Sequence, residues 1–313
     1  MSECEKYIIE IAEEVSSATG GSLKIPTTRW ITRPDGKDSI ADATFAFVID
    51  GKSFSNGIVL LVSNEQYPNM VGEGVARARS IRSILAPKTR DHILVPLYEG
   101  KYGSQTFAAF QRLTPATGNR IFGILQKRMN ASEIVSWSAS LADQTQNYLL
   151  ESFDAHFVDP LNFLVNDPLA TPRVREIAKN CQNSITKSHR GRLWACVEHG
   201  DFWIGNVLFD RNITPLLFGK PQNFYVIDWG GSSNIGYPII DVIRFLRSIY
   251  KPNQAKRLLD QYKSDLKICH SHVLIYVMLG LGRLGENLNQ FPRSRFNALC
   301  ESTLDFLEAM EKE

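Results

Sequence analysis

Residues 197–209 read VEHGDFWIGNVLF, and residues 225–230 read YVIDWG. In each stretch a short apolar run, which is typical of a buried strand, stands beside polar residues that a core would not select. These polar residues include two carboxylates and one amide, on Asp201, Asn206 and Asp228. Hard oxygen donors of this kind can hold Mg²⁺ and leave one carboxylate free to act as a base. The two stretches therefore predict a site for phosphoryl transfer.

The composition is that of an ordinary globular protein and argues against several other classes. The chain has 313 residues, of which 43% are hydrophobic and 22% charged, enough for about two domains or one large one. The net charge of +2 gives no field that would attract nucleic acid or an anionic membrane. The longest apolar run, Val273 to Leu281, is too short to cross a bilayer. We therefore expect no nucleic-acid partner and no association with a membrane. The sequence gives no prediction of the oligomeric state.

The cysteines and the N-terminus point to a cytoplasmic location. The five cysteines are scattered, with no C-x-x-C pair, which is typical of reduced thiols. The first residues are charged and lack the apolar segment of a signal peptide.

The N-terminal third alternates between helical and strand patterns. Apolar residues at helical spacing predict helices over Cys4–Ala18 and Asn69–Leu85. Runs of β-branched, aliphatic and aromatic residues bounded by turn signals predict five strands, at Thr27–Thr32, Thr44–Ile49, Gly57–Val62, Ile93–Tyr98 and Thr106–Leu113. This order predicts a small antiparallel sheet with one helix packed on it.

The pattern changes after Thr114–Gly118, where proline and glycine mark a hinge. Residues Ile121–His189 are mainly helical, with a loop near Asp159–Pro172, and short strands follow near Ala195, Val207 and Val226. Four helical patterns close the chain, at Ile239–Tyr250, Gln254–Lys267, His272–Leu288 and Ser294–Met310. The chain is therefore predicted to be an α+β protein with two lobes, residues 1–115 and 116–313, and a ligand between them.

The strands near Val207 and Val226 also predict the geometry of the site. Two adjacent strands joined by a hairpin return the chain to the same end of a sheet, so Asp228 should lie beside Asn206. Both could then bind Mg²⁺ while Asp201 faces the phosphoryl acceptor. His199 and Gly200 should shape the loop, because glycine tolerates backbone angles that other residues avoid.

The order H-G-D-x-x-x-x-N followed by I-D closely resembles the aminoglycoside phosphotransferase and choline kinase family, which shares the protein-kinase-like fold. The match consists of His199-Gly200-Asp201 with Asn206, then Ile227-Asp228. Gly236-Tyr237-Pro238-Ile239-Ile240-Asp241 looks like the family's G-x-P-x-x-D segment. Motif-level similarity covers about residues 197 to 245, whereas the lobe pattern covers most of the chain.

The resemblance implies a bilobal fold with a small β-rich N-lobe that covers ATP or GTP and a mostly helical C-lobe. It assigns Asp201 as the catalytic base, and Asn206 and Asp228 as the Mg²⁺ ligands. The adenine should bond backbone groups near Gln111 and Leu113. Asp241 should anchor the catalytic-loop backbone, although its position before Val242-Ile243 also suits an ordinary helix cap.

The N-lobe departs from the family pattern. The family has a phosphate-binding lysine on the third strand, paired with a glutamate on the next helix. Glu73 could be that glutamate, but Leu61 occupies our best match to the lysine position. Lys37 in the turn Arg33–Ser39 could supply phosphate charge, though a solvated turn lysine is the more ordinary interpretation. Arg77, four residues after Glu73, suggests an intrahelical ion pair.

The sequence leaves three function classes open. An active small-molecule kinase is favoured by the complete set of Asp201, Asn206 and Asp228, and a pseudokinase scaffold by the absent lysine. A protein kinase is disfavoured because no A-P-E-like segment follows Asp228. The expected acceptor is a small-molecule hydroxyl, with a sugar or amino-sugar as first guess. Trp203 would then stack on the acceptor, or else pack between the lobes.

Overall fold

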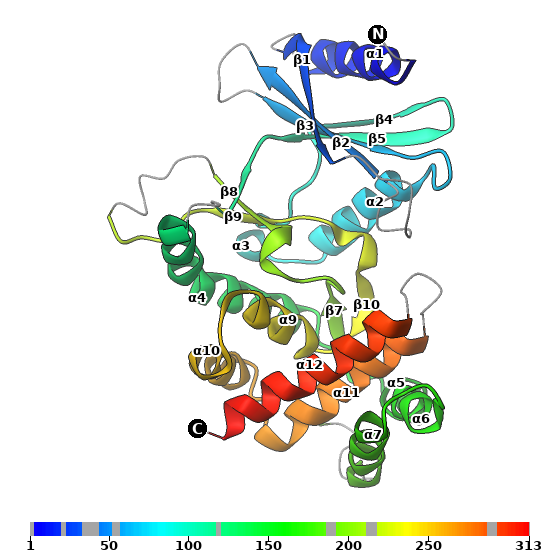
Figure 1. The fold of residues 1–313 in the computed structure, drawn as a ribbon, viewed down its shortest axis with the longest axis vertical. Coiled ribbons are helices and arrows are strands. Elements are labelled where there is room, and N and C mark those ends of the chain that lie inside the picture. Colours follow the sequence, from blue (N-terminus) through cyan, green and yellow to red (C-terminus); the bar gives the residue numbers. More distant parts are fainter. Residues whose placement is uncertain are drawn as a thin grey trace.

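The computed structural model describes residues 3–19, 23–32, 44–51, 57–116, 120–185, 192–210, 218–286 and 293–312. A sheet-rich lobe formed by the N-terminal third stands above a larger helical lobe (Figure 1). The two-lobe α+β prediction is therefore confirmed. The predicted division between residues 115 and 116 remains a prediction. The two-residue strand β6 (Thr114–Pro115), on the N-lobe side of that division, pairs with a strand of the helical lobe.

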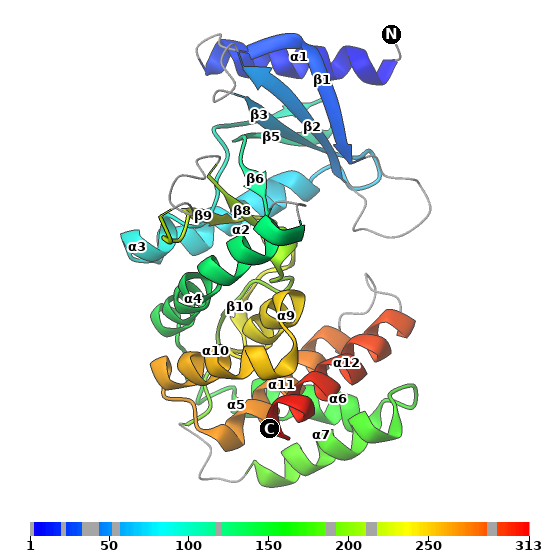
Figure 2. The same cartoon turned by 60° about the vertical axis from the view of Figure 1, so that its left-hand side comes forward.

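The N-lobe contains one antiparallel sheet with the order β1-β2-β3-β5-β4. Helix α1 (Glu3–Ala18) covers one face of it, and α2 (Met70–Ser83) contacts the other (Figure 2). Ile8, Ile11 and Val15 of α1 pack on Phe47, Leu60 and Phe107 of the sheet, which explains the helical spacing of these apolar residues. The strands are β1 (Leu23–Thr32), β2 (Thr44–Gly51), β3 (Ile58–Ser63), β4 (Tyr98–Tyr102) and β5 (Gln105–Gln111).

The predicted strand at Ile93–Tyr98 is wrong, because β4 begins only at Tyr98. Ile93 instead makes an isolated parallel bridge to Val226 of the C-lobe. The backbone N–H of Leu94 donates to Val226, and that of Val226 donates to His92. Ile93 and Leu94 are buried against a strand of the other lobe, whereas Leu97 is 56% exposed and its backbone N–H donates to Ala109 of β5. An apolar pattern reports burial and does not identify the element that provides it.

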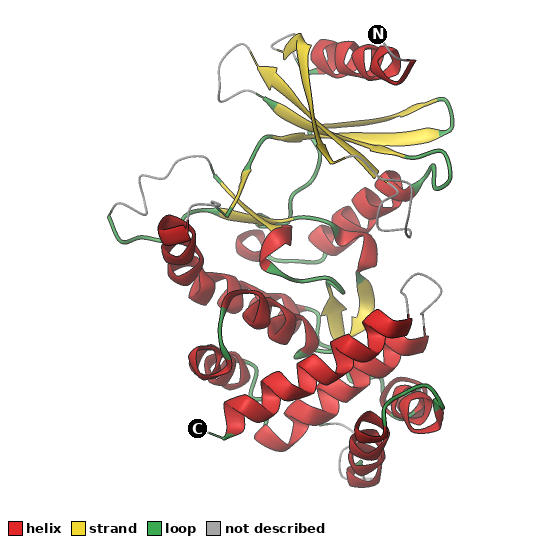
Figure 3. Ribbon diagram, viewed as in Figure 1, coloured by secondary structure: helices red, strands yellow, loops and turns green. Residues whose placement is uncertain are grey.

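Helices make up most of the C-lobe (Figure 3). They are α4 (Arg120–Gln144), α5 (Phe153–Phe157), α6 (Asp159–Asn166), α7 (Pro172–Ser184), α9 (Ile240–Ile249), α10 (Pro252–Asp265), α11 (His270–Glu286) and α12 (Arg293–Glu311), with the short α3 (Pro87–Arg90) preceding them. Among the described residues no single helix is long and apolar enough to cross a membrane; α10 and α11 pass that test only as a pair, with a 98° bend between them.

The loop predicted near Asp159–Pro172 is wrong over its first half, which forms α6. Pro160 lies in the first turn of this helix, where its missing N–H costs no hydrogen bond.

Short strands carry the polar stretches through the helical lobe. They are β7 (Cys196–Glu198), β8 (Val207–Phe209), β9 (Phe224–Val226) and β10 (Ser233–Gly236). Strands β6, β8 and β9 form one small sheet, and β7 pairs with β10 in another. Strands β7, β8 and β9 were predicted from the sequence, and β10 was not.

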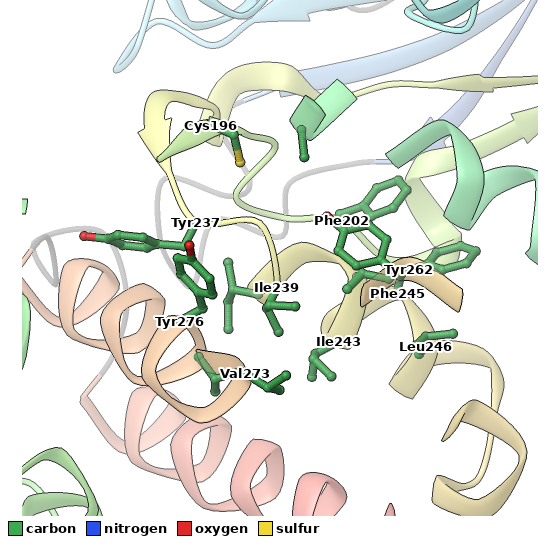
Figure 4. Close-up of a cluster of buried hydrophobic side chains, with 14 of the residues drawn as sticks. Cys196, Phe202, Tyr237, Ile239, Ile243, Phe245, Leu246, Tyr262, Val273 and Tyr276 are labelled. Carbon is green, nitrogen blue, oxygen red and sulfur yellow. The ribbon is translucent and has the colours of Figure 1, made fainter. Parts of the chain in front are cut away.

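The core of the helical lobe is built around α9 (Figure 4). Ile243, Phe245 and Leu246 of this helix are fully buried. The Phe245 ring stacks on Phe202, with ring centroids 5.0 Å apart. Because Phe202 directly follows Asp201, this contact attaches the loop that carries Asp201 to the core of the lobe.

We expect Gly282→Ala to destabilise the fold. A Cβ atom at Gly282 in α11 would lie 2.1 Å from the backbone carbonyl oxygen of Pro160, so α6 and α11 would have to separate. Overpacking of this kind typically costs about 1–3 kcal/mol. Chemical denaturation would measure the change in the free energy of unfolding.

Gly74→Ala in α2 is the matched control. Its new Cβ would lie no closer than 3.7 Å to its nearest neighbour, the backbone nitrogen of Gly230. Alanine's better helix propensity should then stabilise the fold by up to about 1 kcal/mol. Equal effects of the two substitutions would contradict the packing assigned to α6 and α11.

Candidate active site

The β8–β9 hairpin brings Asn206 and the segment before Asp228 together. Val207 of β8 pairs with Val226 of β9 in antiparallel register. One residue beyond that pair, the backbone N–H of Ile227 donates to the carbonyl oxygen of Asn206 at 3.0 Å. Asp228 therefore follows at the end of the hairpin where Asn206 lies, as the strand pattern predicted.

Asp201 lies in the loop between β7 and β8 and presents its carboxylate at the surface. The side chain is 46% exposed. Its Oδ1 accepts a hydrogen bond from an Nη atom of Arg244 at 2.7 Å, and its Oδ2 accepts one from Asn206 Nδ2 at 3.1 Å. Each carboxylate oxygen has a second lone pair, so both can still accept from another group. The carboxylate is thus held in one orientation and remains accessible to an acceptor hydroxyl.

Asn206 is buried and fixed by the loop that it closes. Its Nδ2 donates to the backbone oxygen of Asp201 at 2.8 Å as well as to the Asp201 carboxylate. Both bonds use the amide nitrogen, so the amide oxygen is the atom left to face a cation. This arrangement suits the predicted role of Asn206 as a Mg²⁺ ligand, which stays a prediction.

Asp228 adopts an unusual backbone conformation, with φ 64° and ψ 62°. Burial raises the pKa of its carboxyl, and the nearby charge of Asp201 raises that pKa further, while His199 and the Gly230 backbone N–H oppose the shift. Two carboxylates that repel each other in this way favour a cation between or beside them.

The predicted metal ligands fit Mg²⁺. No cluster of three His, Cys, Asp or Glu side chains able to hold a metal occurs in the part of the chain that the structure describes. The expected set of one carboxylate and one amide oxygen is nonetheless that of Mg²⁺, which usually takes its remaining ligands from phosphates and water. Asp228 and Asn206 offer such oxygens at one end of the hairpin.

Asp241 anchors the catalytic loop from the first turn of α9. Its buried carboxylate accepts from the backbone N–H of His199 at 2.6 Å and from that of Gly200 at 3.2 Å. The predicted anchor is confirmed. The alternative role as helix cap is wrong, because Ile239 occupies the N-cap position and α9 already includes Asp241.

His199 and Gly200 shape the loop as predicted. His199 is buried, and its Nε2–H donates to the carbonyl oxygen of Ile227 at 2.9 Å. That bond fixes the tautomer and leaves Nδ1 to accept the Asp201 backbone N–H at 3.3 Å. Gly200 has φ +80°, and a Cβ there would lie 2.3 Å from the Gly231 carbonyl oxygen. Glycine is therefore required both by conformation and by space.

Trp203 remains available at the surface. Its ring lies over Gly205 of the same loop, since a Cβ at Gly205 would come within 2.3 Å of the indole. It is 46% exposed, which argues against the alternative that it packs between the lobes. Its predicted contact with the acceptor stays a prediction.

The N-lobe face toward α2 is apolar where the family has its lysine. Leu61 of β3 packs with Val71 and Val75 of α2 and with Ala108 and Phe110 of β5. Lys37 and the rest of the turn Arg33–Ser39 lie outside the described residues.

Arg77 of α2 reaches the segment after Asp228 instead of pairing with Glu73. Its guanidinium donates to the carbonyl oxygen of Gly230, two residues after Asp228. Glu73 is exposed and makes no ion pair with a described residue. The predicted Glu73–Arg77 pair is therefore wrong, and the arginine joins the two lobes.

Gln111 and Leu113 lie where the chain passes between lobes. Gln111 ends β5 in register with Ile58. Leu113 lies in the unpaired segment between β5 and β6, and its backbone groups bond no other described residue. Free backbone groups of this kind could pair with adenine, so the nucleotide prediction is compatible with this geometry and stays untested.

A ligand between the lobes also stays a prediction. A hollow of about 420 Å³ lies between α2 and the β4–β5 hairpin, lined by residues that include Val75, Arg79 and Lys101. Asp201, Asn206 and Asp228 do not line it.

The sequence interpretation missed two residues of α9 that hold the catalytic loop. Arg244 bonds the Asp201 carboxylate and also the Gly200 carbonyl oxygen. Ser248 accepts the backbone N–H of Ile204 at 3.0 Å. Both follow Asp241 on one helix, so the anchor position and helical spacing together could have indicated them.

Comparison with known proteins supports a kinase-like fold. Residues 107–274 match the sequence profile of the Ecdysteroid kinase-like family. A search of curated protein sequences finds no match.

Solved structures with the same fold include small-molecule kinases. A protein assigned as a fructosamine-3-kinase from Haemophilus somnus 129PT is 10% identical with a TM-score of 0.53, over 94% of this chain and 96% of that chain. Choline kinase LicA from Streptococcus pneumoniae is 13% identical with a TM-score of 0.52, over 98% of this chain and 100% of that chain. An aminoglycoside-3'-phosphotransferase of type VIII also aligns, at 13% identity and a TM-score of 0.45, over 87% and 97%. The predicted protein-kinase-like fold and family resemblance are confirmed.

The strand before the loop holds another carboxyl group, that of Glu198, whose pKa is raised. Glu198 lies on β7 beside Asp241, and its carboxylate accepts the Tyr237 backbone N–H at 3.1 Å. Burial, and secondarily the charge of Asp241, raise the pKa of Glu198 to about 8. Asp241 accepts two backbone N–H groups where Glu198 accepts one, so the proton shared by this pair belongs on Glu198.

We therefore expect the thermal midpoint of unfolding to fall as the pH rises in the wild type, and to fall less in the Glu198→Gln variant. A carboxyl whose folded-state pKa is raised stabilises the fold fully below its ordinary value of 4.5, and this contribution is lost as the pH rises through about 8. Glutamine can accept the same hydrogen bond and does not titrate. Thermal unfolding of both proteins between about pH 5 and 9 would measure the difference. Parallel plots of thermal midpoint against pH would refute the raised pKa of Glu198. The substitution of the exposed Glu133 by Gln is the control.

Proposed function

The chain belongs to the ecdysteroid kinase-like family, and we propose that it is a Mg²⁺-dependent phosphotransferase. It would move the γ-phosphoryl group of ATP or GTP to a hydroxyl of a small molecule, with sugars and amino-sugars as first candidates. A cytoplasmic location remains part of this proposal.

The observation that carries the proposal is the arrangement of the loop between β7 and β8. An accessible carboxylate, Asp201, is oriented by Arg244 and Asn206. The same Asn206 lies at the end of the hairpin that leads to Asp228. A base for the acceptor and oxygen ligands for a cation therefore stand side by side, which is what phosphoryl transfer needs.

The chemistry assigned to Asp201 is proton acceptance. As the acceptor oxygen bonds to the γ-phosphorus, the bond between that phosphorus and the bridging oxygen of the diphosphate breaks. The hydroxyl proton passes to the Asp201 carboxylate, and the nucleoside diphosphate leaves with the electron pair of the broken bond. Arg244 stays bonded to Oδ1 and keeps the carboxylate aimed throughout.

Asp228 and the amide oxygen of Asn206 are the residues that would hold Mg²⁺. The bound ion would supply positive charge against the phosphate oxygens. Backbone groups of Leu113, which bond no other described residue, would bind the nucleotide base. Arg77 would act indirectly, because its bond to the Gly230 carbonyl steadies the turn that follows Asp228.

A scaffold without catalysis is the second candidate, and Leu61 favours it. An apolar residue packed on Val71 and Val75 cannot contact phosphates, so one source of transition-state charge stabilisation is absent. A scaffold, however, has no physical need for an oriented, accessible carboxylate beside a cation site. Measurements of binding and turnover distinguish the two.

We expect Asp228→Ala to abolish the Mg²⁺-dependent part of nucleotide affinity. Removing the one carboxylate among the proposed ligands should raise the Kd for ATP in the presence of Mg²⁺ by about tenfold or more, roughly 1.4 kcal/mol. Calorimetric titration with ATP and with GTP, each with and without Mg²⁺, would measure it. Exposed Asp265→Ala is the control; unchanged binding by Asp228→Ala would remove Asp228 from the metal site.

We expect Asp201→Asn to bind Mg²⁺ and nucleotide normally but to lose phosphoryl transfer. Asparagine keeps an oxygen for Arg244 and cannot take the proton, so turnover should fall about a hundredfold or more. Nucleoside diphosphate release in an acceptor screen of aminoglycosides, choline, sugars and a generic protein would report it. Wild-type turnover in this variant would contradict the role of Asp201 as the base.

A further inference from the structure

Arg247 is a charged side chain of α9 with neutral partners. Its two Nη atoms donate to the hydroxyls of Thr303 at 2.6 Å and Ser302 at 2.7 Å, both on α12. In the regions that the structure describes, no carboxylate forms an ion pair with it. The guanidinium is partly buried between two helices. A charge that is partly removed from water is normally compensated by an opposite charge, and no described residue provides one here.

The neighbourhood of Arg247 adds positive charge. Burial and the charge of Arg244 both lower the pKa of its guanidinium. Arg244 is compensated by the Asp201 carboxylate, whereas Arg247 is not. Arg244, Arg247 and the Asp201 carboxylate that Arg244 binds together carry a net positive charge.

Arg247 lies on the same helix as Arg244 and Ser248, which hold Asp201 and the loop around it. Residues three apart on a helix share a face, with Cβ atoms about 5–6 Å apart, so Arg247 lies one turn beyond Arg244. The next residue, Ser248, bonds the catalytic loop at Ile204. Helices α9 and α12 lie side by side in the helical lobe, away from the N-lobe sheet that would cover the nucleotide (Figures 1 and 2).

We propose that Arg247, with Arg244 beside it, binds an anionic group of the acceptor. The substrate would then be a small hydroxyl compound that also carries a carboxylate or a phosphate, such as a sugar acid or a sugar phosphate. This inference rests on the proposed function, and it narrows the acceptor from sugars in general. The planar guanidinium suits an oxyanion with two acceptor oxygens, and the pair of arginines repels an amine. Cationic acceptors such as choline and amino-sugars are therefore disfavoured.

The test is a series of probes that share a skeleton and differ in charge. Glucose, glucosamine, glucuronate and glucose 1-phosphate form one set; glycerol, serinol, glycerate and glycerol 3-phosphate form another. Thermal shift and calorimetry on the full chain, with and without Mg²⁺ and a non-hydrolysable ATP analogue, would report binding. We expect an anionic member of at least one set to bind at least about tenfold more tightly than its neutral and cationic counterparts.

Three variants locate the effect. Arg247→Gln should abolish the preference for anions, and Arg247→Lys should retain part of it, because lysine keeps the charge without the fork. Arg257→Gln, on the exposed side of α10, is the matched control and should behave as the wild type. The thermal midpoint of each variant without probes identifies any loss of folding, and the Lys variant keeps the test valid if the Gln variant is unstable.

The outcomes separate this inference from the proposed function. Equal or tighter binding of neutral or cationic probes, a preference for anions that survives in Arg247→Gln, or no binding of any probe would overturn the inference. Nucleotide binding and Asp201-dependent turnover would leave the proposed function standing in each of those cases. Absence of Mg²⁺-dependent nucleotide binding in the wild type would instead overturn the proposed function.

Discussion

The bond between the Asp241 carboxylate and the backbone of His199 and Gly200 is the interaction on which the site depends. Hydrogen bonds to a charged group contribute about 1.5–3 kcal/mol each, and here two of them are buried together. They fix the turn in which Gly200 must be a glycine, and Asp201 follows it. Arg244 projects from the same helix and orients the Asp201 carboxylate. Helix α9 thus sets both the backbone and the side chain of the proposed base.

The lobes are joined near Asp228 by a contact that the family pattern does not suggest. Leu61 fills the lysine position with an apolar side chain, so β3 contributes packing there and no charge. Arg77 of α2 instead donates to the Gly230 carbonyl, and a Cβ added to Gly74 would lie only 3.7 Å from the Gly230 nitrogen. Helix α2 is therefore placed by the segment after Asp228. A movement of α2 would therefore shift the turn after Asp228.

Local patterns predicted the parts of the site that local geometry decides. A hairpin brings its two ends together whatever surrounds it, so Asn206 and Asp228 could be placed from strand spacing. The partners of longer-range contacts could not be predicted. Arg77 and Gly230 are separated by 153 positions, and the run at Ile93 pairs with Val226 of the other lobe. The segment Asp159–Asn166 was predicted as a loop, although the proline near its start is favourable in a first helical turn.

The central claim is that the loop from His199 to Asn206 transfers a phosphoryl group to a small-molecule hydroxyl through Asp201. Its most direct test is mass spectrometry of an acceptor mixture incubated with Mg²⁺ and ATP labelled with ¹⁸O in the γ-phosphoryl group. The account predicts one acceptor that gains a labelled phosphoryl group with the wild type and gains none with Asp201→Asn. Mg²⁺-dependent ATP binding without labelled product from any acceptor would contradict it and favour the scaffold.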